Sequence, residues 1–540
     1  MWLKFFHNES KTIAGAAVLI GVLSFCSRMM GLIRDRILAG AFGAGDTLDI
    51  YYAAFKIPDF LFNLIVIGAL SASFIPLFAK FYHRPDGKEY AWRLTNNVLN
   101  LIGCMVLVGT VVLFFLREPL SAWIAPGFSL GKQHMVAHWT GIMLLAQVFL
   151  AASVVFGSAL QGMKRFFLYA LAPIFYNIGI IVGALWLTRL FGPIGLAWGV
   201  ALGAFFHFSI QIYGVLAAGY RYIWTFEWRD QSVQEIFRLM GPRLLGLAVA
   251  QVNVVLMTVI ASWLLPGSLT ILNFAYNIQF FPVGIIGIAY AVAVFPVLSD
   301  HAEQRHPERF VSAFSASVRQ TLFLIVPMMF VFLILRAQIV RVVVGAGKFG
   351  WSETIQTANT LAFFALSFFS QSIVYLLARA YFALRDTMTP FIIGLATAVI
   401  NLLASLYFTQ WLGVPGFGAA FTLSSVINMA LLWVPLRARM GNLDEWRILS
   451  SLYIITTAGV IAALVMQILK PLTVLLVPLN TFFGVFLQGA IAGGIGLLVY
   501  AGIAWILKSP EMRDLTVSIQ KKLFRKSSPE EPISSDSPVL

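Results

Sequence analysis

Long apolar runs follow one another along almost the whole chain, and their length restricts its fold more than any other feature. A transmembrane helix needs about 20 predominantly apolar residues. The runs reach that length without the alternation of apolar and polar residues that marks the strands of a membrane barrel. Within hydrocarbon the backbone must satisfy its own hydrogen bonds, which leaves helices as the structure for such runs. The sequence therefore predicts an all-α polytopic membrane protein.

Charged residues are too scarce to cover a water-soluble surface. Of the 540 residues, 59% are hydrophobic and 11% are charged, whereas a soluble globular chain has about 25% charged residues. The net charge of +14 does not indicate a nucleic-acid partner, because the basic residues lie between apolar runs rather than in one basic domain. Cys26 and Cys104 both fall inside apolar runs and predict no disulfide framework. No small-residue cleavage site follows the first run, so we expect that run to be retained.

Hydropathy predicts about fourteen spanning helices, over residues 12–41, 50–79, 95–116, 136–161, 168–189, 194–219, 236–265, 270–298, 318–343, 355–378, 389–410, 414–436, 448–469 and 482–507. With both termini on one side, the loops, tails and helix ends of that side hold 26 of the 37 Lys and Arg residues, and the opposite side holds 7. Cytoplasmic loops carry the excess of basic residues, so both termini are predicted to be cytoplasmic. The polar tail after residue 507 is predicted to be disordered, with basic residues that can touch anionic lipid headgroups.

An internal repeat divides the chain. Four segments recur in order: residues 28–32 with 243–247, 54–57 with 275–278, 74–76 with 294–296, and 192–195 with 413–416. Six predicted helices separate the copies, so both copies run in the same direction across the membrane. Parallel repeats of this kind build two lobes around a central path. We therefore expect an N-lobe over 1–219, a C-lobe over 220–440, two further helices over 441–507, and a tail over 508–540.

The first apolar run carries a stripe of small and polar residues on one helical face: Ala17, Gly21, Ser24, Arg28, Gly31 and Asp35. Small residues alone would indicate close helix packing. An arginine in the bilayer, however, costs at least about 2.5–3.5 kcal/mol unless it is paired or hydrated. One interpretation is an ion pair between Arg28 and Asp35. The other, which we favour, is a water-filled cavity for an anion, because Arg28, Arg34 and Arg36 outnumber the single acid.

Other helices contribute fewer polar residues. Lys56 shares a helical face with Asp59 and Asn63, and Arg243 lies on a stripe with Asn253. Arg243 could equally lie at the cytoplasmic interface, and Asn277 could make an ordinary bond between helices. The glycine-rich segment 345–350 lacks a strand–helix context for a nucleotide. No catalytic group or metal-binding cluster is predicted, and no nucleotide-binding motif indicates ATP as the fuel.

Several motifs, spread over nearly the whole chain, resemble those of the MurJ (MviN) lipid II flippases. They are residues 25–35, 42–45, Asp49, 55–58, 68–71, 74–76, 238–248, 251–253 and 378–390. The resemblance implies the multidrug/oligosaccharidyl-lipid/polysaccharide exporter fold, with the last two helices forming a groove for a lipid tail. It implies that Arg28, Arg34, Asp35 and Asp49 are functional cavity positions. Phe62 and Asn277 replace arginines common in the family, and Ile67 and Met257 replace acids, so an acid-dependent sodium site is not expected.

The predicted function is a flippase that moves lipid II, an undecaprenyl-pyrophosphate-linked peptidoglycan precursor, across the cytoplasmic membrane by alternating access. The predicted substrate-binding residues are Arg28, Arg34, Asp35, Asp49, Lys56, Asn277 and Arg243. We expect a monomer that contacts membrane lipids and has no cofactor, with an ion or the membrane potential supplying the energy. The alternatives are an exporter of another lipid-linked oligosaccharide or of drugs and, less consistent with the sequence, a membrane-embedded transferase.

Overall fold

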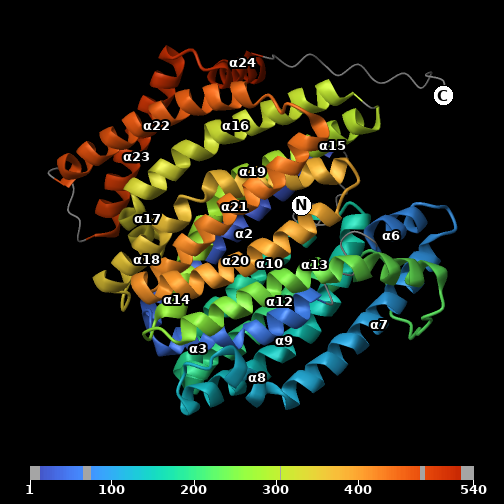
Figure 1. Cartoon of the computed structure of the whole chain (residues 1–540). Coiled ribbons are helices and arrows are strands. Elements are labelled where there is room, and N and C mark those ends of the chain that lie inside the picture. Colours follow the sequence, from blue (N-terminus) through green and yellow to red (C-terminus); the bar gives the residue numbers. More distant parts are fainter. Residues whose placement is uncertain (1–12, 65–73, 305, 475–480, 525–540) are drawn as a thin grey trace. The chain divides into compact units, whose positions relative to one another are not determined.

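The computed structural model describes the backbone of residues 13–64, 74–304, 306–474 and 481–524. Side chains are described for residues 19–64, 74–238, 240, 251–304, 306–474 and 481–517. Throughout this part of the chain the regular elements are helices, and no strand occurs (Figure 1). The all-α prediction is confirmed for these residues.

The helices gather into two compact units. The first comprises Met1–Phe281, Arg336–Ser367 and Thr387–Leu431. Its elements are α2 (Ile13–Phe42), α3 (Asp46–Ala54), α4 (Lys56–Phe62), α6 (Phe74–Tyr82), α7 (Lys88–Phe115), α8 (Arg117–Ile124), α9 (Leu130–Gly162), α10 (Phe166–Val182), the π-helix η2 (Gly183–Leu187), α11 (Thr188–Phe191), the 3₁₀-helix η3 (Gly192–Ile194), α12 (Gly195–Leu216), α13 (Gln231–Ser262), α14 (Ser268–Pro282), α17 (Arg336–Val343), α18 (Trp351–Ala365), α20 (Met388–Leu412) and most of α21 (Pro415–Met440).

The second unit comprises Pro282–Leu335, Phe368–Asp386 and Leu432–Leu540. Its elements are the π-helix η4 (Val283–Ile288), α15 (Ala289–Glu303), α16 (Pro307–Ile334), α19 (Phe368–Ala383), the end of α21, α22 (Glu445–Val474), α23 (Phe482–Ile506) and α24 (Pro510–Phe524).

Within the described residues, nine helical segments are long and apolar enough to cross a membrane, or ten if the bent pair α18–α19 forms one span. One of the nine covers Phe166–Leu216. It reverses at Gly192, where φ is +70°, and α10 packs against α12, so it is a helical hairpin. The chain is therefore a multi-pass membrane protein. The total of fourteen helices and the lobe boundaries remain predictions.

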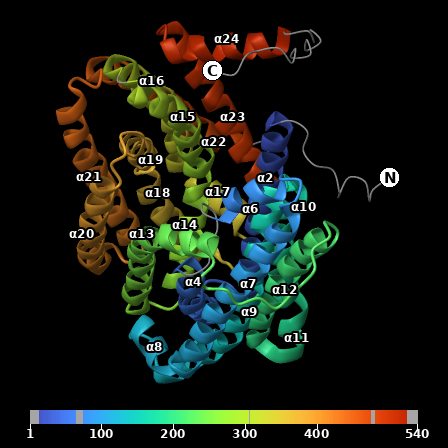
Figure 2. The same ribbon diagram turned by 90° about the vertical axis from the view of Figure 1, so that its right-hand side faces the viewer.

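Glycines bring α10 and α12 into backbone contact. A Cβ added at Gly179 would overlap Gly203, and one at Gly183 would overlap Gly199. Small residues spaced by four positions let membrane helices approach closely, because lipid supplies little hydrophobic force to hold them together. Helices α9, α10 and α12 consequently lie side by side (Figures 1 and 2).

The internal repeat is visible in the order and spacing of the elements. Helices α7 and α16 begin 219 residues apart, as do α8 and α17, and α9 and α18 begin 221 residues apart. Backbone features repeat at the same spacing. Gly192 and Gly413 both have positive φ, as do Lys164 and Arg385, which end α9 and α19 respectively. The two copies therefore share several helix starts and turns, although α9 is continuous where its counterpart is broken into α18 and α19.

Two predictions about the C-lobe and tail are wrong. The predicted span 318–343 is shifted, since α16 covers Pro307–Ile334 and the polar sequence from Arg336 begins the separate helix α17. The tail was predicted to be disordered from residue 508, yet Pro510–Phe524 forms α24. Its polar composition resembles that of a disordered segment, but its first turn is tied to the helices of the second unit, as described below.

Candidate functional site

The small-residue stripe of α2 borders open space. A Cβ added at Gly21 or at Gly31 would meet no atom within 4 Å. Ser24, which lies between them on the stripe, is exposed. Close packing against a neighbouring helix is therefore not the reason for small residues at these positions. Ala17 lies outside the residues whose side chains are described.

Arg28 lies on this open face and is exposed. Its guanidinium lies over the ring of Phe280, 5.6 Å from the ring centroid. Among the described side chains, no carboxylate lies within salt-bridge distance of Arg28. A guanidinium held over an aromatic ring keeps its hydrogen-bond donors available for an anion.

Arg34, by contrast, is committed to protein partners. Its Nε and Nη2 donate to Asp35 Oδ1 at 3.0 and 2.8 Å, and its Nη1 donates to Asn177 Oδ1 at 3.0 Å. The other oxygen of Asp35 accepts a hydrogen bond from the Asn277 amide at 3.1 Å. Asp35 is 2% exposed, so its charge is satisfied by this network and not by solvent.

This network corrects one sequence-based alternative. The ion pair between Arg28 and Asp35, the less favoured of the two interpretations, does not form, because Asp35 pairs with its neighbour Arg34. Asn277 takes part in the network while remaining exposed. Asn177 was missed by the sequence reasoning. The signal was present, since an asparagine within an apolar spanning segment is a functional candidate by default.

Two charged residues, Arg36 on α2 and Asp49 on α3, contact segments that are distant in the sequence. Arg36 Nη1 donates to the backbone oxygens of Arg341 and Val342 at 3.3 and 2.6 Å. Asp49 Oδ2 accepts from the Gly267 backbone at 2.6 Å. Its Oδ1 accepts from the backbone and hydroxyl of Thr270 at 2.8 and 2.6 Å. Asp49 was expected to face the substrate, yet here it is buried and its carboxylate is fully occupied by these donors.

The contacts around Asp49 follow the internal repeat. Asp49 and Thr270 are separated by 221 residues, so equivalent positions of the two copies touch each other. Gly127 N donates to Ser262 Oγ at 3.0 Å. Its equivalent, Lys348 N, donates to Gly40 O at 2.9 Å. We call this set of contacts the closed end; it consists of Arg36, Gly40, Asp49, Gly127, Ser262, Gly267, Thr270 and Lys348.

The remaining predicted residues are less informative. Lys56 and Asp59 are half-buried and three residues apart on α4, which brings opposite charges to neighbouring positions. Arg243 lies in α13, but its side chain is outside the described residues. Ile67, where the sequence departs from the family pattern, also lies outside them.

Met257, the other departure, lies in an uncharged cluster that joins α13 to α20 and α21. Ser405 donates to the sulfur of Met257 at 3.4 Å, and Asn401 donates to Asn253 Oδ1 at 3.4 Å. Ser424 donates to Asn401 Oδ1 at 3.3 Å. Among the described residues, no three His, Cys, Asp or Glu side chains form a group that could hold a metal ion.

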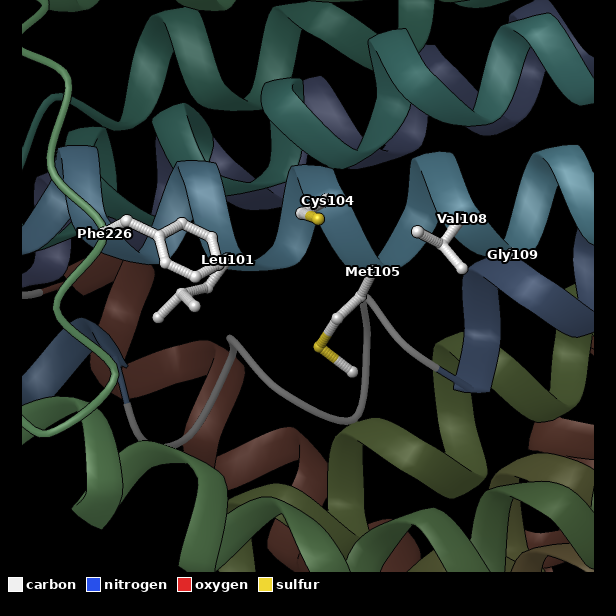
Figure 3. Close-up of a pocket in the computed structure, with 6 residues that line it drawn as sticks. All are labelled: Leu101, Cys104, Met105, Val108, Gly109 and Phe226. Carbon is white, nitrogen blue, oxygen red and sulfur yellow. The ribbon is translucent and has the colours of Figure 1, made fainter.

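An apolar hollow of about 420 Å³ lies along α7 and shares no residue with the Arg34 network. Leu101 and Phe226 lie together at one end of it (Figure 3). Cys104, Met105, Val108 and Gly109 complete its lining. The described residues that line the hollow carry no charge, so they offer no ionic partner to the headgroup of an anionic substrate.

Many apolar helices, together with an arginine exposed on one of them, are typical of a membrane transporter. The sequence matches the family described as "Lipid II flippase MurJ" over residues 38–484. The chain therefore belongs to the MurJ lipid II flippase family, whose members are transporters rather than enzymes.

Relatives and solved structures agree with this assignment. A "Probable lipid II flippase MurJ" of Vibrio cholerae is 28% identical over 434 residues, covering 78% of this chain and 83% of the relative. One from Thermotoga maritima is 28% identical over 417 residues, covering 76% and 82%. The fold is similar to "Lipid II flippase MurJ, inward closed conformation", with a TM-score of 0.75 at 24% identity, over 92% of this chain and 100% of that one. It is also similar to an inward-facing MATE-family transporter, with a TM-score of 0.65 at 13% identity, over 79% and 99%.

Proposed function

We propose that this protein moves lipid II from the inner to the outer leaflet of the bacterial cytoplasmic membrane by alternating access. Family membership supports the substrate class. The observation that carries the proposal is Arg28, an exposed guanidinium without a carboxylate partner among the described side chains, on a helical face that borders open space. In lipid such a charge is costly unless water or an anion accompanies it.

Arg28 and Arg34 have different roles in this proposal. Arg28 binds the pyrophosphate, since a guanidinium offers paired donors that match phosphate oxygens. Arg34 and Asn277 hold Asp35 in its buried position, so the Arg34 network shapes the wall beside Arg28. Lys56 adds a weaker point charge. The polyprenyl tail stays in lipid, which spares the protein from enclosing a long apolar chain.

Alternating access requires the closed end to open. With both termini cytoplasmic, as the basic residues of the loops favour, the Gly40 end of α2 faces outward. The contacts of the closed end then block the outer exit. Release of lipid II to the outer leaflet requires separation of Asp49 from Thr270 and of Gly40 from Lys348. Because both contacts join a position of one repeat to a position of the other, we expect them to separate together.

The energy source is proposed to be the membrane potential, acting on the charges that move with the substrate. Each elementary charge that crosses the membrane is worth about 2.3 kcal/mol per 100 mV. The uncharged surroundings of Met257 favour a mechanism without an acid-bound cation at that position. We propose that the protein acts as a monomer and has no resident cofactor.

A depletion test decides the function. The chain is expressed in cells from which the resident lipid II flippase is removed, and growth and outer-leaflet lipid II are measured. Wild type and the loop variant Arg229→Ala should sustain growth, whereas Arg28→Ala should not, at equal membrane abundance. Failure of the wild-type chain to move lipid II, both in cells and in proteoliposomes, would refute the proposal.

Likeness to the MATE transporter shows the fold alone, yet it raises a second candidate, export of another lipid-linked oligosaccharide or of a drug. A cationic drug would favour acids over an unpaired arginine in the binding region. Proteoliposomes that transport an alternative lipid-linked sugar but not lipid II would favour the second candidate.

A further inference from the structure

Helix α24 turns away from the last spanning helix. Lys508 adopts a left-handed conformation with φ of +54°. The bonds Lys508 N to Trp505 O (3.0 Å) and Ser509 N to Ala504 O (2.9 Å) close the end of α23. Helix α24 then begins at Pro510 and lies across the end of α23 instead of continuing it (Figure 2). With Glu511, Arg513 and Asp514 in its first turns, it is too polar to cross a bilayer.

Glu511 fixes the first turn of α24 to two spanning helices. Its Oε1 accepts hydrogen bonds from Arg319 of α16 and Ser451 of α22, both at 2.8 Å. Its Oε2 accepts from Ser509, also at 2.8 Å. Burial acts to raise the pKa of Glu511, but the hydrogen bonds and the Arg319 charge outweigh it and lower that pKa. The acid therefore stays ionised and keeps Arg319 occupied.

Beyond Glu511 the helix is open on the surface of its unit. The side chains of Leu515 and Val517 are 36% and 41% exposed. The segment from 508 to 526 has six basic residues, Lys508, Arg513, Lys521, Lys522, Arg525 and Lys526, against the acids Glu511 and Asp514. Because Glu511 is neutralised by Arg319, the charge presented by this segment is strongly positive.

Tryptophans mark the level of the membrane surface beside α24. Trp505, at the end of α23, is 61% exposed, and Trp446, at the start of α22, is 82% exposed. Tryptophan side chains on membrane proteins concentrate at the headgroup level. A helix that starts five residues after Trp505 and runs across the end of α23 is therefore held at that level.

We propose that α24 is an in-plane surface helix that binds the anionic phospholipid headgroups of the adjoining leaflet. Its basic residues attract the headgroups, and the exposed side chain of Val517 enters the boundary between headgroups and acyl chains. Clusters of four to eight basic residues directly after a spanning helix have the charge that such lipids require. The Glu511 contacts fix the first turn of the helix at the level of this surface. The inference goes beyond the proposed function and does not depend on it.

The test uses the full chain with Cys26→Ser and Cys104→Ser, and a polarity-sensitive dye on Val517→Cys. The protein is placed in nanodiscs of phosphatidylcholine with or without phosphatidylglycerol. Both leaflets of these nanodiscs have the same composition, so the result depends neither on the topology of the chain nor on transport. We expect a blue-shifted emission and several-fold weaker acrylamide quenching with phosphatidylglycerol, and reversal by high salt. The same dye on Asp86→Cys, in the turn between α6 and α7, is the matched control.

Three results would overturn the proposal. Equal quenching in the two lipids means that anionic headgroups are not bound. The same protection from inorganic phosphate in phosphatidylcholine discs means a site for free phosphate and not for a lipid surface. Protection that persists in Lys521→Gln/Lys522→Gln means apolar insertion without charge recognition. Folded yield of that variant, measured by size-exclusion chromatography, is expected to equal wild type, so misfolding can be told apart.

Discussion

The two halves of α2 use their charges in opposite ways. Residues 21–31 leave Arg28 exposed on an open face, whereas residues 34–40 commit Arg34, Asp35 and Arg36 to fixed partners. One half is therefore suited to bind an anion and the other to hold the protein closed. The charge of a residue in a membrane helix therefore does not reveal its role, whereas the partners of that charge do. Variants in the two halves of α2 should separate effects on transport from effects on folding.

The largest effect is expected for Arg28→Ala, which should abolish lipid II transport and leave the folded yield unchanged. Among the described side chains, Arg28 has no carboxylate partner that its removal would leave unpaired. Arg28→Lys should retain part of the activity, because it keeps the charge but not the paired donors. Transport is measured in proteoliposomes and folded yield by size-exclusion chromatography. A parallel loss of folded protein would contradict the assigned division of α2.

Arg34→Ala should lower stability instead, by about 3–5 kcal/mol, since it leaves a buried carboxylate without its cation. Asp35 is buried, and its ion pair with Arg34 would be lost in this variant. Thermal unfolding in detergent measures the loss. The double variant Arg34→Ala/Asp35→Asn should recover part of the stability without restoring transport. If Arg34→Ala is as stable as wild type, the network does not contribute to the stability of the protein.

Asp49→Asn should weaken the closed end by about 1.5–3 kcal/mol, because bonds to a charged acceptor are lost. A cysteine at Ala44, in a background without Cys26 and Cys104, should then react faster with a water-soluble thiol reagent. Asp46→Asn is the control, since Asp46 forms a half-exposed pair with Lys132, worth about 0–1 kcal/mol. An unchanged rate in Asp49→Asn would separate this residue from closure.

Lys56→Ala should reduce transport by less than Arg28→Ala does. A lysine is a point charge, whereas an arginine can bind phosphate through two parallel hydrogen bonds. Asp59 also lies one turn away and attracts Lys56 in the absence of substrate. Initial rates of lipid II transport for the two variants, compared at equal reconstituted protein, give the ranking. The reverse order would move the main anion contact from α2 to α4.

Asn277→Arg should have the smallest effect. Asn277 is exposed, so a longer side chain has room at this position. A guanidinium there can also donate to Asp35 in place of the amide. Folded yield and lipid II binding are the readouts. Collapse of the yield would show that Asn277 packs against protein and would remove α14 from the site.

Residue spacing along α2 was enough to predict the open stripe, because helix periodicity is a local property. It could not predict that Asp35 pairs with Arg34. Adjacent residues on a helix do not face each other, and this contact depends on how far the arginine side chain bends back and on Asn177, 143 residues away. The partners of Asp49 are equally remote. The repeat makes Thr270 the position equivalent to Asp49, but the repeat alone does not indicate that the two copies touch there.

The tail illustrates a different reason for failure. Composition predicts whether a segment can form its own core. Composition does not predict a single buried contact that can order a segment without a core of its own. Glu511 and Arg319 are 192 residues apart, and nothing local to α24 indicates that they meet. The same reasoning explains why the apolar helices were found readily and their joints, such as the break between α16 and α17, were not.

The glycine contact between α10 and α12 also has a consequence for how the gene can vary. Every amino-acid replacement at Gly179, Gly183, Gly199 or Gly203 adds at least a Cβ, and at these positions even that atom overlaps the facing helix. In a saturation-mutagenesis library selected for growth, almost no substitution at these four positions should therefore survive. Codons for lipid-facing neighbours such as Trp186 and Trp198, which are 57% and 42% exposed, should accept many. Along the hairpin, positions that tolerate no substitution would then alternate with positions that tolerate many.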